Sequence, residues 1–77
     1  QTVKENISVF PNPAYEKIHV SGNYEILEMH DIFGKVVHTE TKNAKSIDLK
    51  NISNGNYIIH FYSKDKNVST RKISIIK

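Results

Sequence analysis

The sequence predicts an all-β domain, either a sandwich or a barrel, and three observations lead to that prediction. Isoleucine, valine, threonine and tyrosine occupy most of the apolar positions, and these residues favour pleated, half-buried strands over helices. Short apolar runs recur roughly every eight to twelve residues between turn-forming residues, which is the spacing of all-β folds. The 77 residues are enough for one domain.

The first two strands are expected at residues 6–10 and 16–20. Between them, Pro11 and Pro13 each remove a backbone donor and fix φ, and each holds the preceding residue in extended geometry. The result is a stiff corner that follows an edge strand. Asn12 stands between the prolines, and its side chain can satisfy backbone groups of the turn.

The third and fourth strands, residues 24–30 and 35–41, are expected to form a hairpin. Gly22, which tolerates positive φ, separates this hairpin from the second strand. Asp31 and Gly34 occupy the first and fourth positions of a type I turn, in which the aspartate accepts backbone hydrogen bonds and the glycine forms a bulge.

The last three strands are expected at residues 45–49, 55–63 and 67–76, separated by polar residues at 51–55 and 64–67. The run over 55–63 is the most apolar of the chain, so it should be a central strand that is covered on both sides. Antiparallel sheets with one solvated face fit this composition best.

The formal net charge of +3 is concentrated in the last segment. Such asymmetry can mark an interaction surface. Equally, lysines on an exposed edge strand protect it against aggregation, and both interpretations stay open. The basic residues from position 64 onward are Lys64, Lys66, Arg71, Lys72 and Lys77, against the single acid Asp65.

Several classes of protein are excluded by what the sequence lacks. There is no cysteine, so disulfides, thiolate metal sites and cysteine nucleophiles are absent. No stretch approaches the roughly 20 apolar residues of a membrane helix, so we expect no direct membrane insertion. The first residues do not have the pattern of a signal peptide, and an export signal would have to lie elsewhere.

No catalytic arrangement is visible either. The four histidines, at positions 19, 30, 38 and 60, stand in separate strands without a paired spacing, so neither a metal nor another cofactor is expected. The glycines are too far apart for a phosphate loop. Exposed aromatics on which nucleic-acid bases could stack are not evident, and the net charge is low. We therefore expect neither an enzyme nor a nucleic-acid partner.

Four motifs, taken in order, resemble the type A C-terminal sorting domain of the type IX, or Por, secretion system. They are a Pro-Asn-Pro corner, an Asp-x-x-Gly-Lys hairpin, a Gly-x-Tyr strand and a basic-apolar final strand. Each is weak alone, whereas four in sequence order within a domain of this length are specific. The matching positions are Pro11, Asn12, Pro13, Asp31, Gly34, Lys35, Gly55 and Tyr57, followed by Arg71, Lys72 and Lys77.

The resemblance implies an immunoglobulin-like β-sandwich of about seven strands and a non-catalytic role. Such domains lie at the C-terminus of larger secreted proteins and address a fused N-terminal cargo from the periplasm to the outer-membrane translocon. A sortase-like cell-surface protease then removes the domain. The resemblance thus implies that residues 1–5 end the linker from the cargo and that residues 6–77 form the domain, with cleavage at or before the linker.

The structural roles of the motifs can be separated in part. We expect Gly34 and Gly55 to serve backbone geometry, Asp31 to cap its turn and Tyr57 to pack in the core. By elimination, the candidates for translocon contact are Arg71, Lys72 and Lys77, and then the exposed part of the Pro-Asn-Pro corner.

Two other functions remain as alternatives. One is a fibronectin-like or carbohydrate-binding module of a secreted enzyme, although there is no tryptophan and the tyrosines are scattered over different strands and turns. The other is a spacer or adhesion domain without a sorting role.

Overall fold

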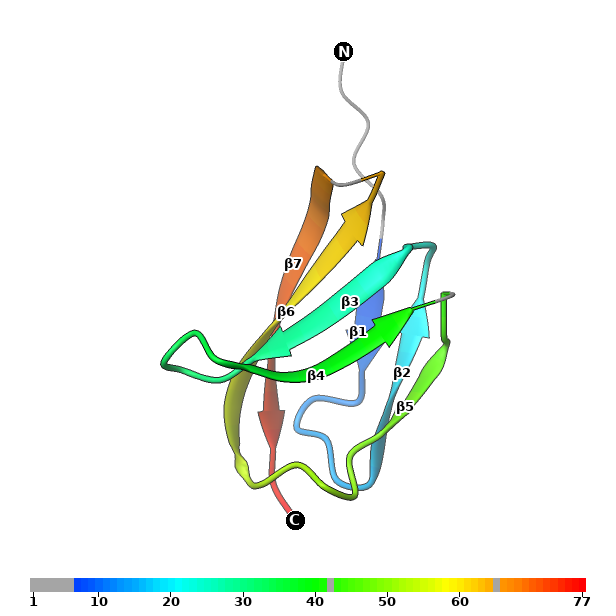
Figure 1. Ribbon diagram of the computed structural model, residues 1–77. Helices are drawn as coiled ribbons and strands as arrows, with labels where there is room; N and C mark the ends of the chain where they lie inside the picture. The colour runs from blue at the N-terminus through cyan, green and yellow to red at the C-terminus, as the bar shows by residue number, and fades with distance from the viewer. Residues whose placement is uncertain (1–6, 42, 65) are drawn as a thin grey trace.

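The computed structural model describes residues 7–41, 43–64 and 66–77, which form two packed antiparallel sheets (Figure 1). The expected linker, residues 1–5, and the expected first strand residue, Asn6, lie outside the described residues. All seven expected strands are present within two residues of the expected bounds. They are β1 (Ser8–Phe10), β2 (Lys17–Ser21), β3 (Ile26–His30), β4 (Val36–Thr41), β5 (Ser46–Asp48), β6 (Gly55–Ser63) and β7 (Lys66–Ile75).

The strand order is that of an immunoglobulin-like sandwich, which confirms the expected fold. One sheet has the order β1-β2-β5, and the other has the order β4-β3-β6-β7. β6 lies between β3 and β7, so the most apolar run is a central strand, as expected. β1 and β7 are edge strands of their sheets, which places the basic tail segment on an edge.

The core fills the space between the inner faces of the two sheets. Alternation along each strand determines which side chains point inward, because successive side chains leave a strand on opposite faces. Tyr24 also enters this core, from the loop before β3. The buried apolar residues are Ile7, Ala14, Ile18, Val20, Tyr24, Leu27, Met29, Ile47, Leu49, Ile52, Tyr57, Ile59, Phe61, Ile73 and Ile75.

The β3–β4 hairpin projects from the body of the sandwich (Figure 1). Its two tip residues, Ile32 and Phe33, are 71% and 88% exposed. Within the part of the chain that the structure describes, no helix has the length and apolar character needed to cross a bilayer.

Candidate functional site

The Pro-Asn-Pro corner lies against the open edge of β7. The Asn12 side chain accepts a hydrogen bond from the backbone N–H of Ser74 through Oδ1 (3.0 Å) and donates one from Nδ2 to the carbonyl of Lys72 (3.3 Å). Its amide therefore pairs with β7 as the backbone of a neighbouring strand would. This corrects the expectation that Asn12 serves its own turn, because its partners are 60 and 62 residues further along the chain.

Backbone pairing continues one residue after the corner. The N–H of Ala14 donates to the carbonyl of Ser74 (2.7 Å), and the N–H of Ile76 donates to the carbonyl of Ala14 (2.9 Å). Ala14 thus forms a parallel bridge with Ile75. Prolines have no backbone N–H to offer a sheet edge, and the Asn12 amide supplies the donor that the flanking prolines lack. Both peptide bonds that precede these prolines are cis.

The three basic candidates of the tail have different surroundings. Arg71 is half-buried, and its guanidinium donates to the carbonyl of Ile7 (2.9 Å) and to that of Thr70 (2.8 Å). The Lys72 side chain points to the opposite face, because it shares a register position with Ile58 on the outer face of the sheet. Lys72 is exposed, and its ammonium has no hydrogen-bond partner among the described residues.

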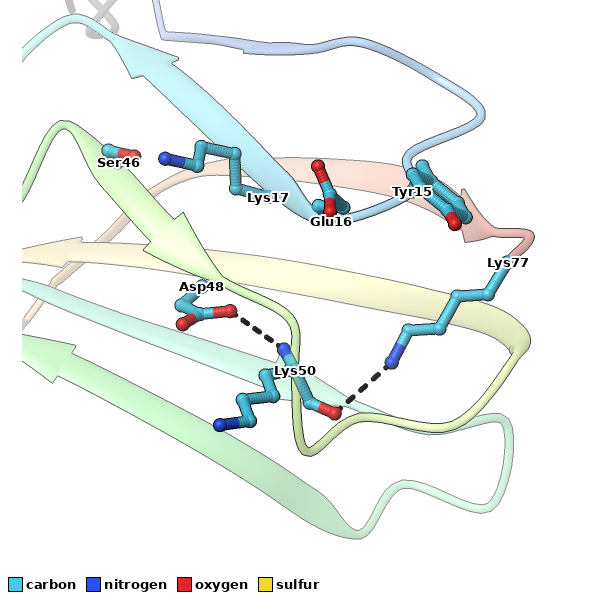
Figure 2. A pocket seen from close by; sticks show the side chains of 7 residues that line it. All are labelled: Tyr15, Glu16, Lys17, Ser46, Asp48, Lys50 and Lys77. Atoms are coloured by element: carbon cyan, nitrogen blue, oxygen red, sulfur yellow. Dashed lines mark hydrogen bonds between the residues drawn. The ribbon is translucent and has the colours of Figure 1, made fainter.

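Lys77 is held at the end of the sandwich (Figure 2). Its ammonium donates to the carbonyls of Leu49 (2.7 Å) and Lys50 (3.3 Å), and its backbone N–H donates to Oδ1 of Asn54 (3.1 Å). The side chain borders an open hollow of about 620 Å³, which is also lined by Tyr15 from the segment after the corner. Three lysines and two carboxylates line this hollow, so its charge is mixed.

The hairpin motif has the expected geometry. Oδ1 of Asp31 accepts hydrogen bonds from the N–H groups of Phe33 and Lys35, each at 2.9 Å. Gly34 has a φ of +85° and donates its N–H to the carbonyl of Asp31 (3.0 Å). The capping role of Asp31 and the backbone role of Gly34 are thus confirmed, whereas Lys35 is exposed.

The Gly-x-Tyr motif is likewise structural. Gly55 has a φ of +156°, which side-chain-bearing residues rarely adopt. The ring of Tyr57 lies 3.5 Å from the point where a Cβ would stand on Gly55 and so covers the glycine. Tyr57 itself is buried, and its hydroxyl donates to the carbonyl of Ser53 (2.6 Å).

Two histidine–carboxylate pairs were not expected from the sequence. His30 Nε2 lies 3.1 Å from Glu28 Oε1, and His38 Nε2 lies 3.0 Å from Glu40 Oε2. In each pair the two residues are two positions apart on one strand, so their side chains lie on the same face. This spacing would have allowed both pairs to be predicted from the sequence. The His60 ring packs against the His30 ring, with centroids 4.6 Å apart. Among the described residues, no three ligating side chains are arranged to hold a metal ion.

Tyr24 is a buried phenol in the core between the two sheets. Its hydroxyl donates to the carbonyl of Ala44, and its ring meets Phe61 edge-on with centroids 5.3 Å apart. Burial, and then the nearby charge of Glu40, raises the pKa of Tyr24 to about 12. The hydroxyl therefore stays protonated at neutral pH and keeps donating to the carbonyl of Ala44, so Tyr24 has a structural role.

The fold is that of an immunoglobulin-like β-sandwich module. The Pro-Asn-Pro corner and Ala14 pair with the outer edge of β7, the last strand. The chain belongs to the family described as the Secretion system C-terminal sorting domain, which its residues 8–77 match. It is thus a type IX secretion sorting signal, and the family implies a secreted protein with an N-terminal cargo that reaches the cell surface or the outside. No curated protein and no solved structure matches the chain.

Proposed function

We propose that this domain directs a covalently fused cargo from the periplasm through the type IX outer-membrane translocon, without catalysing a reaction itself. The observation that carries the proposal is the family match over residues 8–77, which includes every described strand. The cargo would enter the periplasm through its own Sec signal. The domain would then be removed by a sortase-like surface protease at or before residues 1–5.

Lys72 is the first candidate for contact with the translocon among the three basic residues proposed from the sequence. Its ammonium is exposed on the outer face, whereas Arg71 and Lys77 donate to backbone carbonyls of other segments. Substitution of Arg71 or Lys77 would disturb these contacts as well as any recognition. Charge reversal at Lys72 therefore separates recognition from folding better than reversal at the other two positions.

The decisive experiment fuses residues 1–77 to a periplasmic reporter in a bacterium that has the type IX system. We expect the reporter at the cell surface or in the medium in the wild-type strain, and in the periplasm of a strain without the translocon. Equal surface delivery in both strains would overturn the proposal.

The position of cleavage is tested with the same fusion. We expect the delivered reporter to lose the sorting domain, with its new C-terminus at or before residues 1–5. Intact-mass measurement of the delivered reporter locates this end, and a strain without the surface protease provides the control. A delivered reporter that still carries residues 6–77 in the protease-competent strain would refute removal of the domain.

The carbohydrate-binding alternative gives a different result. A carbohydrate module binds polysaccharide saturably and does not need the translocon for its action. Titration of the domain with polysaccharides, followed by NMR, discriminates the two functions, because a sorting signal is expected to show no saturable shifts.

A further inference from the structure

All four sequence motifs, although far apart along the chain, meet at one groove on the outside of the larger sheet. The groove has a volume of about 320 Å³. The corner contributes Asn12, the hairpin contributes Ile32, and the Gly-x-Tyr strand contributes Asn56, Tyr57 and Ile58. The final strand contributes Lys72, Ile73 and Ser74.

The walls of this groove are mainly apolar, with one cationic group. Ile32 stands at the exposed hairpin tip and Ile58 is half-buried on β6, so both offer hydrocarbon surface to a ligand. Lys72 is the charged member of the lining, and no carboxylate lies among the lining residues. Phe33, the next residue after Ile32, is 88% exposed and extends the apolar surface beyond the groove.

A partner cannot approach this region by adding a strand along the adjacent edge. The backbone groups of Lys72, Ser74 and Ile76 at that edge are already bonded to Asn12 or Ala14. Strand addition needs unpaired backbone groups at a sheet edge. Recognition at this place must therefore use side chains on the face of the sheet.

We propose that this groove is the surface by which the sorting domain is recognised, and that it receives a polypeptide segment presenting an apolar side chain beside a carboxylate. The segment belongs to the secretion machinery, so the proposal rests on the sorting function proposed above. Its apolar side chain packs between Ile32 and Ile58, and its carboxylate pairs with the ammonium of Lys72. The carboxylate is inferred from charge complementarity, because the groove carries one cation and no acidic residue to pair with it.

The test uses reporter fusions with single substitutions in the groove. Ile32→Asp places a charge on the apolar wall, and Lys72→Glu reverses the cation. We expect each to reduce surface delivery by about tenfold or more, as the loss of a buried apolar contact or of a charge pair does in other interfaces. Lys72→Arg keeps the positive charge and is expected to reduce delivery less than Lys72→Glu does.

Matched controls lie at the hollow that Lys77 borders, at residues that do not line the groove. Tyr15→Asp removes an aromatic that is 59% exposed, and Lys50→Glu reverses an exposed lysine there. Both are expected to deliver normally. The substituted side chains are exposed, so we expect all of the variants to fold. Far-UV circular dichroism and thermal melting of each 77-residue variant check this.

The outcomes separate this inference from the proposed function. If the wild-type fusion fails to reach the surface, the sorting function itself fails. If the wild-type fusion is delivered and the folded Ile32→Asp and Lys72→Glu variants are delivered equally well, the groove is overturned as the recognition surface. If sedimentation shows a dimer that Ile32→Asp dissociates without loss of delivery, the occupant is a second copy and the proposal is wrong.

Discussion

Asn12 carries two hydrogen bonds that no other part of the corner can make. Replacing it with alanine removes both and leaves the N–H of Ser74 and the carbonyl of Lys72 without their partners. We expect Asn12→Ala to lower the free energy of unfolding by about 1–3 kcal/mol, since each net hydrogen bond contributes about 1 kcal/mol. Urea denaturation measures the change.

An exposed asparagine in the turn before β6 supplies the control for this prediction. Asn51→Ala should change the free energy of unfolding by no more than about 0.5 kcal/mol, as is usual for exposed positions. If Asn12→Ala is as mild as Asn51→Ala, then the side-chain pairing with β7 contributes nothing to stability.

Tyr24 should give the domain a pH dependence in the alkaline range. Its pKa is raised from 10.0 to about 12, so its contribution to stability is complete below pH 10 and is lost as the pH rises towards 12. Absorbance at 295 nm should show one phenol that ionises near pH 12. Tyr24→Phe should abolish that phase; if the phase persists, another phenol is responsible.

At the scale of the element, the β3–β4 hairpin depends on one glycine. A Cβ on Gly34 would meet no atom within 4 Å, so the cost of a side chain there is purely conformational. We expect Gly34→Ala to destabilise the domain by about 1 kcal/mol because of the positive φ. Gly34→Asn should cost less, because asparagine tolerates this region. Thermal melting compares the two, and equal losses would contradict the conformational explanation.

The strands themselves could be predicted from the sequence because their signals are local. Alternation of apolar residues and turn chemistry, such as the Asp31–Gly34 turn, are read within a few positions. The pairing of β2 with β5, and of β3 with β6, could not be read in the same way. These partners are far apart along the chain, and a strand pattern does not name its neighbour.

The same limit applies to the candidate site. The sequence indicated the corner and the basic tail as separate features, and the family resemblance joined them only as motifs in order. That Asn12 bonds to β7, and that Ile32 and Lys72 line one groove, depends on contacts between distant segments. By contrast, the pairs Glu28–His30 and His38–Glu40 were within reach, because a spacing of two puts side chains on one face of a strand.

For the whole molecule, we expect removal of residues 72–77 to unfold the domain. Ile73 and Ile75 are buried, and truncating one such side chain to alanine already costs about 2–5 kcal/mol. The total free energy of unfolding of a native protein is only about 5–15 kcal/mol. Circular dichroism should therefore show the loss of strand signal and of a cooperative thermal transition.

The exposed substitution Lys72→Gln is the control for this truncation. It should leave the thermal transition within a few degrees of the wild type, because exposed charges contribute little to stability. A truncated chain that still melts cooperatively would show that the C-terminal part of β7, from Lys72 onward, is dispensable for folding. In that case a secretion defect of the truncation would report recognition directly.

The closure of the β7 edge also sets the order in which the chain can fold. Arg71 reaches Ile7 across 64 residues, and Asn12 reaches Ser74 across 62. Contacts of such large sequence separation form late, and sandwiches dominated by them fold in milliseconds to seconds. The segments before β7 therefore lack these partners until the last strand of the chain is available, and the sandwich is completed only when that strand pairs.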